Sequence, residues 1–193
     1  KTNIDKIREL YDTNKNLAKQ MKADNLPAVT ITGVFESYRR VDLVSKINPI
    51  IAIDIDRDDN IHIKDWEELK RTIAKLPYVF LTSYSCSGKG IYCLIYFNTE
   101  LNFEKMFYAL ECDFKELSIN IDKNCKDITR LRFISYDNNK IIKHINDTII
   151  IIPNIIKIIE SAKLKLFIPS FNIFSISINL YDWGLIEKNI KNP

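Results

Sequence analysis

The stretch NPIIAIDID, residues 48–56, decides the fold of this 193-residue chain. Its run of isoleucines predicts a buried strand, and the run ends in two carboxylates separated by a single residue. Because residues i and i+2 of a strand project from the same face, Asp54 and Asp56 are expected to point together, with Ile53 and Ile55 on the opposite face. The strand therefore predicts one apolar face for a core and one acidic face.

Working outward, the chain alternates between helical and extended patterns. Asp65 is placed to cap a helix with apolar residues on one face, and Asn102 is placed to cap a second helix. Between them, YVFLTSY (78–84) and IYCLIYF (91–97) predict two strands joined by the small-residue turn SCSGKG (85–90). A further strand is predicted at LRFISY, residues 131–136. The order is strand, helix, strand, strand, helix, strand.

This order predicts an α+β fold of the ferredoxin-like or RRM-like kind, the split βαβ pattern used by polymerase palms. It implies a four-stranded antiparallel sheet with both helices on one face. An amphipathic helix (NIDKIRELYDTNKNLAKQMKAD) and a short strand (AVTITGVF) are predicted before it. Residues 1–152 are expected to form one domain, and residues 153–193 a C-terminal helical extension or linker.

Composition restricts the function only weakly. The chain is 46% hydrophobic and 27% charged, as in an ordinary globular protein, and its net charge of +3 does not establish nucleic-acid binding. Its four cysteines form no CxxC pair, so reduced thiols in a cytoplasmic protein are expected rather than a zinc site. The most apolar run, around residues 148–159, is too short to span a bilayer, and no membrane association is expected.

The carboxylate pair predicts a metal site. Two carboxylates on one face repel each other unless a cation lies between them, and Mg²⁺ and Mn²⁺ prefer such oxygen ligands. Two such ions can activate a hydroxyl and stabilise a leaving pyrophosphate. The alternative is that Asp54 and Asp56 merely end a strand before the polar turn DRDDN (56–60).

The turn SCSGKG offers a phosphate site next to these acids. Gly88 and Gly90 let the backbone approach a ligand, Ser85 and Ser87 can donate hydrogen bonds, and Lys89 adds a positive charge. The turn is not a Walker A loop, because the GxxxxGK[ST] spacing is absent and a strand follows. The alternative is a hairpin with a solvated lysine.

A third acid and two arginines follow in SINIDKNCKDITRLRFISYD, residues 118–137. Asp122 is the candidate third acid, and Asp127 is the substitute. Arg130 and Arg132 lie two residues apart at the start of a predicted strand, so both can face one side and bind a triphosphate. The alternative is ordinary surface charge.

Taken together, the segments LPAVTITGVF, Arg39-Arg40, IIAIDID, SYSCSGKG and DITRLRFISYD resemble, in this order, the VirE N-terminal-like family of mobile-element and phage proteins. That family is found in Bacteroidetes-type bacteria and looks like a branch of the archaeo-eukaryotic primase (primase-polymerase) superfamily. The resemblance covers roughly residues 26–137. Its first motif, acid-x-acid, corresponds to Asp54 and Asp56, and its third motif to Asp122.

The resemblance implies a template-directed nucleotidyltransferase, a primase or DNA polymerase, acting in mobile-element or phage replication with Mg²⁺ or Mn²⁺. Asp54, Asp56 and Asp122 would be the catalytic metal ligands. Nucleotide contacts would come from Ser85, Ser87, Gly88, Lys89, Arg130 and Arg132, and a template or nucleotide contact from Arg39 or Arg40. The implied partners are single-stranded or primed DNA, nucleoside triphosphates and a helicase domain or protein.

The second motif departs from the family pattern. Its Ser-x-His-like segment corresponds to residues 85–90, but Ile91 and Tyr92 follow and no histidine is present. Lys89 could replace the charge of that histidine. The departure keeps open a second class, a non-catalytic DNA-binding module derived from the same fold. A third class, a histidine-dependent replication-initiation nuclease, would need closely spaced histidines, whereas His62 and His144 are far apart.

Overall fold

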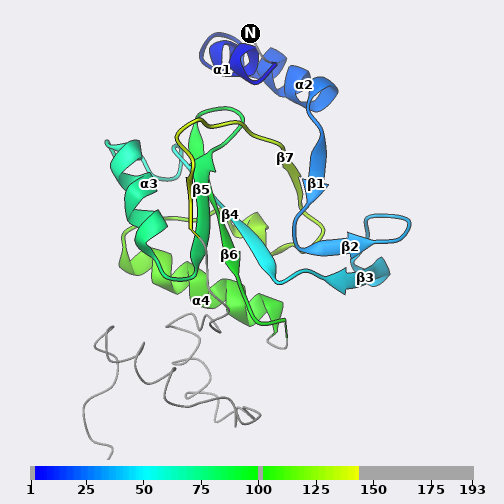
Figure 1. Cartoon of the computed structure of the whole chain (residues 1–193). Coiled ribbons are helices and arrows are strands. Elements are labelled where there is room, and N and C mark those ends of the chain that lie inside the picture. Colours follow the sequence, from blue (N-terminus) through cyan, green and yellow to red (C-terminus); the bar gives the residue numbers. More distant parts are fainter. Residues whose placement is uncertain (1–2, 100–101, 144–193) are drawn as a thin grey trace, which may run out of the picture. The chain divides into compact units, whose positions relative to one another are not determined.

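The computed structural model describes residues 3–99 and 102–143, which form an α+β fold with four α-helices and small antiparallel sheets (Figure 1). The predicted α+β class is therefore confirmed. The main sheet contains β4 (Ile50–Asp56), β6 (Gly90–Tyr96), β5 (Val79–Tyr84) and β8 (Ile141–Ile142), in that spatial order. Each neighbouring pair is antiparallel, and Asp54 lies opposite Tyr92 and Asp56 opposite Gly90.

The two helices predicted after β4 and β6 are present. Helix α3 (Trp66–Lys75) begins at Asp65, whose side chain accepts a hydrogen bond from the backbone N–H of Glu68 at 2.8 Å. Helix α4 (Phe103–Glu116) begins at Asn102, whose side chain accepts from the backbone N–H of Lys105 at 3.0 Å. These caps satisfy N–H groups that have no partner within the helix.

The core lies on the face of the sheet opposite Asp54. Ile53 and Ile55 of β4 are completely buried, and α3 packs against β5 and β6. Other fully or nearly fully buried apolar residues come from β4, β6, α3 and α4, namely Ile51, Ile91, Cys93, Ile95, Ile73, Met106, Phe107, Leu110 and Phe114. Alternation along β4 thus places an aliphatic core on one side and leaves the acids on the other.

The predicted fourth strand is present but lies elsewhere. Residues Leu131–Phe133 form β7, which pairs with β1 (Ala28–Thr30) and not with β4. The free edge of β4 is instead occupied by the segment leading into the 3-10 helix η2 (Lys123–Lys126). There the backbone N–H of Asp122 donates to the carbonyl oxygen of Asp54 at 2.9 Å. The strand order β4-β6-β5 agrees with a split βαβ unit, whereas β8 beside β5 does not.

The N-terminal segment predicted as one helix forms two. Helix α1 (Asn3–Thr13) ends before Asn14, and α2 (Lys15–Asn25) begins after it. The Asn14 side chain accepts a hydrogen bond from the N–H of Leu17 at 3.1 Å, so Asn14 caps a new helix instead of continuing the first. The following apolar stretch likewise forms two short strands, β1 and β2 (Gly33–Phe35). Strand β2 pairs with β3 (Val44–Ile47), with the 3-10 helix η1 (Val41–Leu43) between them.

The predicted boundary between residues 152 and 153 lies outside the described residues. Among the helices of the described part, none has the length and apolar character that a membrane span requires.

Candidate functional site

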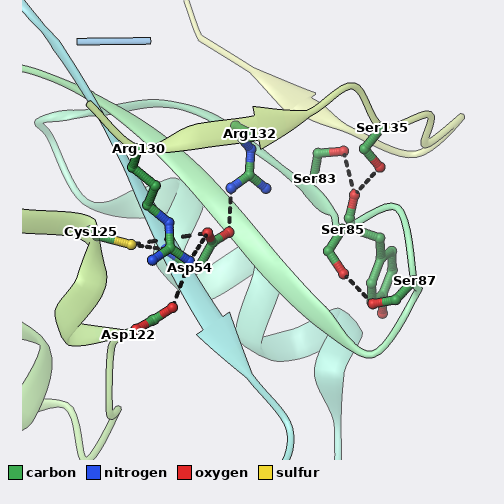
Figure 2. A network of polar contacts seen from close by, with 10 residues as sticks. Asp54, Ser83, Ser85, Ser87, Asp122, Cys125, Arg130, Arg132 and Ser135 are labelled. Atoms are coloured by element: carbon green, nitrogen blue, oxygen red, sulfur yellow. Dashed lines mark hydrogen bonds and ion pairs between the residues drawn. The ribbon is translucent and has the colours of Figure 1, made fainter. Parts of the chain in front are cut away.

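Asp54 lies at the centre of a network of polar contacts on the face of the main sheet opposite the isoleucine core (Figure 2). Strand β4 holds it so that its side chain points away from the isoleucine core, as the alternation predicted. Its carboxylate is less than one-fifth exposed, so its charge is only partly solvated. A charge in that position needs nearby opposite charges.

Asp122 and Cys125 lie beside Asp54 because the η2 segment runs along the edge of β4. The backbone N–H of Asp54 donates to Cys125 Sγ at 3.3 Å. One oxygen each of Asp54 and Asp122 and the sulfur of Cys125 all lie within 4.8 Å of one another, a group that could hold a metal ion. Asp56 is not part of this group, although it was predicted as a ligand.

Two arginines neutralise these acids. Arg130 Nη2 lies 2.6 Å from a carboxylate oxygen of Asp122 and 3.3 Å from one of Asp54. Arg132 Nη1 pairs with the other oxygen of Asp54, and the Arg132 guanidinium lies 3.6 Å from the centre of the Tyr92 ring. The pair predicted to bind a triphosphate is therefore brought to the acids predicted to bind metal (Figure 2).

Burial and neighbouring carboxylates raise the pKa values of Asp56 and Cys125. Burial, followed by the charges of Asp54 and Asp122, raises the pKa of Asp56 to about 6, although Arg130 opposes this. Burial and the neighbouring Asp54 raise the pKa of the Cys125 thiol to about 12. Carboxylate oxygens such as those of Asp54 and Asp122 are ligands that hard divalent cations prefer.

The turn Ser85–Gly90 lies next to the end of β4. The N–H of Arg57 donates to the carbonyl oxygen of Lys89 at 3.1 Å. A Cβ atom at Gly90 would lie 2.5 Å from the carbonyl oxygen of Ile55 and 2.9 Å from Asp56 Oδ1, so only glycine allows this approach. Gly88 has a φ of +69°, which glycine also adopts at little cost.

Inside the turn, the two serines bond to each other. Their hydroxyl oxygens lie 3.0 Å apart, and the N–H of Lys89 donates to Ser87 Oγ at 3.2 Å. Ser135, in the segment after β7, donates to the carbonyl oxygen of Tyr84 at 2.6 Å, which connects the turn to that segment. The Lys89 ammonium forms an ion pair with Asp12 of α1.

The remaining candidates lie outside the cluster. Arg39 donates to the carbonyl oxygen of Thr129 at 2.6 Å, and Arg40 forms an exposed ion pair with Asp42 at 2.7 Å. Asp127 accepts from the N–H and hydroxyl of Thr129 at 2.8 and 3.0 Å, so it shapes its own turn. Of the two candidate third acids, only Asp122 contacts the Asp54 network.

Histidine ligation receives no support in the described part of the chain. The Nε2 atom of His62 lies 2.7 Å from the carbonyl oxygen of Ser118, a contact that joins the loop before α3 to the segment after α4. His144 falls outside the described residues.

Three features of the site were missed from sequence. Cys125 follows Asp122 by three residues, but no spacing distinguishes it from an ordinary buried thiol. The side chain of Asn60 is fully buried. Its Nδ2 atom donates hydrogen bonds to the carbonyl oxygens of Asp56 at 2.9 Å and of Asn120 at 2.8 Å. Its Oδ1 atom accepts a hydrogen bond from the N–H of Asn120 at 2.8 Å. Asn60 therefore fixes the approach to Asp122 relative to β4. Its place in the polar turn DRDDN gave no sign of burial.

A second buried polar group supports the turn from behind. The ammonium of Lys70, on α3, is 1% exposed and lies 3.3 Å from Asp137 Oδ2 and 3.2 Å from Glu67. Asp137 also accepts from the N–H of Tyr84 at 3.1 Å. The start of the turn is thus held by an ion pair that helical periodicity alone would have assigned to the surface.

Residues 21–141, more than half of the chain, match the family described as BT4734-like, N-terminal domain. The chain belongs to the BT4734-like N-terminal domain family. This family is related to VirE N-terminal and primase domains, so the resemblance seen in the sequence is confirmed at that level. No curated protein and no solved structure matches the chain.

The BT4734-like domain contains every labelled residue of the network in Figure 2. Helix α1 lies before residue 21 and outside the matched span.

Proposed function

We propose that this BT4734-like domain is a template-directed nucleotidyltransferase, a primase or DNA polymerase that acts in mobile-element or phage DNA replication. One observation carries the proposal. Two carboxylates, Asp54 and Asp122, and two arginines, Arg130 and Arg132, converge on the open face of the sheet, next to a glycine-containing turn. Metal-dependent nucleotidyl transfer requires this combination of acids and cations.

The acids would hold Mg²⁺ or Mn²⁺, with Asp54 and Asp122 as direct ligands and Asp56 beside them. When bound, such ions activate the attacking hydroxyl and neutralise the charge on the leaving pyrophosphate. The segment along β4 fixes the separation of the two carboxylates through the bond from the Asp122 N–H to the Asp54 carbonyl oxygen. Rigid positioning of this kind is a major part of catalysis in phosphoryl and nucleotidyl transfer.

The cations would hold the incoming triphosphate. Arg130 and Arg132 present planar guanidinium groups that can bind phosphate oxygens in pairs. Ser85, Ser87, Gly88 and Lys89 supply hydroxyls, a close backbone approach and one ammonium at the neighbouring turn. The triphosphate would therefore lie between the turn and the arginines, with its reacting end toward Asp54.

Template or primer would bind outside this cluster. Arg40 is exposed, and its pair with Asp42 is of the weakly stabilising surface kind, so Arg40 is available to a DNA phosphate. Arg39 is committed to Thr129 and would hold the β2–β3 hairpin in place. Single-stranded or primed DNA is the expected substrate, with a helicase as a further partner.

The test is synthesis on single-stranded and primed DNA with nucleoside triphosphates and Mg²⁺ or Mn²⁺. We expect labelled product from the wild-type chain and none from Asp54→Asn. Asp58→Asn is the matched control, because Asp58 is an 86% exposed acid beyond the strand, paired only with Lys15 among the described residues. Loss of product in both variants, or in neither, would contradict the assignment.

A second candidate function is a non-catalytic DNA-binding module. The observation that favours it is that Arg130 and Arg132 already neutralise Asp54 and Asp122. In addition, Ile91 is buried and Tyr92 lies under Arg132, so neither replaces the histidine of the second motif. This alternative predicts salt-sensitive DNA binding without metal-dependent product.

A further inference from the structure

Helix α1 contacts the turn between β5 and β6, although α1 lies before residues 21–141, the span that matches the family. Arg8 Nη2 donates to the carbonyl oxygen of Ser85 at 3.2 Å and to that of Tyr136 at 2.7 Å. One guanidinium therefore joins the first residue of the turn to the segment that follows β7. Hydrogen bonds from a charged donor are stronger than neutral ones, so this connection restrains the turn.

Arg8 also packs against the glycine of the turn. A Cβ atom at Gly88 would lie 3.4 Å from Arg8 Cδ and 3.5 Å from Arg8 Nε. The Nε atom is buried and has no hydrogen-bond partner among the described residues. An unpaired buried donor is costly. Arg8 is therefore held against the turn by packing and by its two Nη2 hydrogen bonds.

A second residue of α1, Asp12, contacts the same turn but is expected to weaken triphosphate binding instead of supporting it. Asp12 forms an ion pair with Lys89, the one ammonium that the turn offers to a phosphate. Asp12 is mostly exposed and Lys89 about one-third exposed, so the pair can open at small cost. Asp12 and a triphosphate would thus compete for Lys89.

We propose that Arg8 is a positioning residue for the nucleotide triphosphate and that α1 is part of the nucleotide site. This inference rests on the proposed function. Arg8 holds the Ser85–Gly90 turn in the conformation that receives phosphate, through its hydrogen bonds to the carbonyl oxygens of Ser85 and Tyr136. Asp12 weakens binding by holding Lys89. Two residues four positions apart on one helix therefore have opposite effects on triphosphate affinity.

The experiment is calorimetric titration of the whole chain with ATP and dATP in Ca²⁺, which supports binding without requiring turnover. We expect Arg8→Met to raise the Kd about tenfold through loss of charged donors, and Arg8→Lys to recover part of the affinity. We expect Asp12→Asn to lower the Kd about twofold, as for an exposed ion pair. Lys15→Met is the matched control, because Lys15 pairs with Asp58 and does not contact the turn.

A purely structural role for α1 makes a different prediction. If Arg8→Met and Asp12→Asn both weaken binding, or both leave it unchanged, the inference is wrong while the proposed function stands. If the wild-type chain binds neither nucleotide, the proposed function fails as well. In synthesis assays, Arg8→Met should raise the KM for nucleotide more than it lowers kcat, and an effect on kcat alone would also overturn the inference.

Discussion

Arg132 forms an ion pair with Asp54 while its guanidinium lies over the ring of Tyr92, the residue directly opposite Asp54 in the β4–β6 pair. The central acid of the candidate site is thus bound by a cation of the same chain. A divalent cation that binds Asp54 has to displace Arg132 from this carboxylate. A triphosphate that binds Arg132 also draws the guanidinium away from Asp54. Binding of metal and binding of triphosphate are therefore expected to favour each other.

The first prediction separates the effect of the arginine–carboxylate ion pairs on triphosphate affinity from the effect of a bound metal. In EDTA, Asp54→Asn should lower the Kd for a nucleoside triphosphate about threefold to tenfold, because Arg132 is no longer held by a carboxylate and Arg130 keeps only its pair with Asp122. The same variant should lose metal-dependent synthesis. Asp56→Asn removes a carboxylate from the same face, and Asp56 forms no ion pair with an arginine of the described residues. Equal effects of both variants in titration would show that general electrostatics, not arginine release, determines the affinity.

A second prediction distinguishes the two candidate third acids. Asp122→Asn should weaken Mn²⁺ binding at least about tenfold, since one of two direct carboxylate ligands loses its charge. Asn can still cap η2, as Asp122 does at 2.9 Å from the N–H of Asn124. Asp127→Asn is the matched control, because Asp127 contacts Thr129 and not Asp54. Calorimetric titration with Mn²⁺ checks this, and equal loss in both variants would contradict it.

The sequence was informative wherever a local pattern determined the structure. Alternation in IIAIDID predicted the acidic face of β4, and Asp65 and Asn102 were recognised as helix caps. In each case the physical cause acts within a few residues of the side chain concerned. Arg130 and Arg132 were predicted to face one side, but their ion pairs with Asp54 were not predicted.

The errors arose where long-range pairing decided the outcome. Strand β7 was predicted to complete the main sheet, yet the η2 segment occupies the edge of β4 and β7 pairs with β1. Local strand propensity does not predict which segment pairs with the edge of β4, because that pairing depends on contacts between residues far apart in the sequence. The same applies to Cys125 and Asn60, whose importance comes from neighbours more than 50 residues away along the chain.

The third prediction concerns Asn60, which joins the end of β4 to the segment before Asp122. Asn60→Ala should lower the free energy of unfolding by about 2–4 kcal/mol, because it removes three hydrogen bonds and leaves buried backbone groups unpaired. Asn124→Ala is a suitable control, since Asn124 is exposed and should cost about 0.5 kcal/mol. Urea unfolding measures both changes, and a small effect at Asn60 would show that this segment is held in another way.

The fourth prediction is a pH dependence of stability that arises from Asp137. Burial acts to raise the pKa of Asp137, but hydrogen bonds from the N–H groups of Tyr84 and Asn139 and the charge of Lys70 outweigh it and lower the pKa below 3.8. A lowered carboxyl pKa contributes stability that is complete above the unfolded value and is lost as the pH falls through the folded value.

Asp137→Asn tests this dependence. At pH 7 the variant should be less stable by about 3 kcal/mol, because Lys70 is buried and keeps only Glu67 as an ionic partner. Below pH 3.8 the difference from wild type should shrink, since Asp137 is protonated in the unfolded chain while it is still charged in the folded protein, and this favours unfolding of the wild type. Urea unfolding at pH steps from 7 to 3 measures the difference. Asp58→Asn, at an exposed pair, should change stability by less than about 0.5 kcal/mol throughout. A difference at Asp137 that stays constant down to pH 3 would mean that packing, not charge, holds this residue.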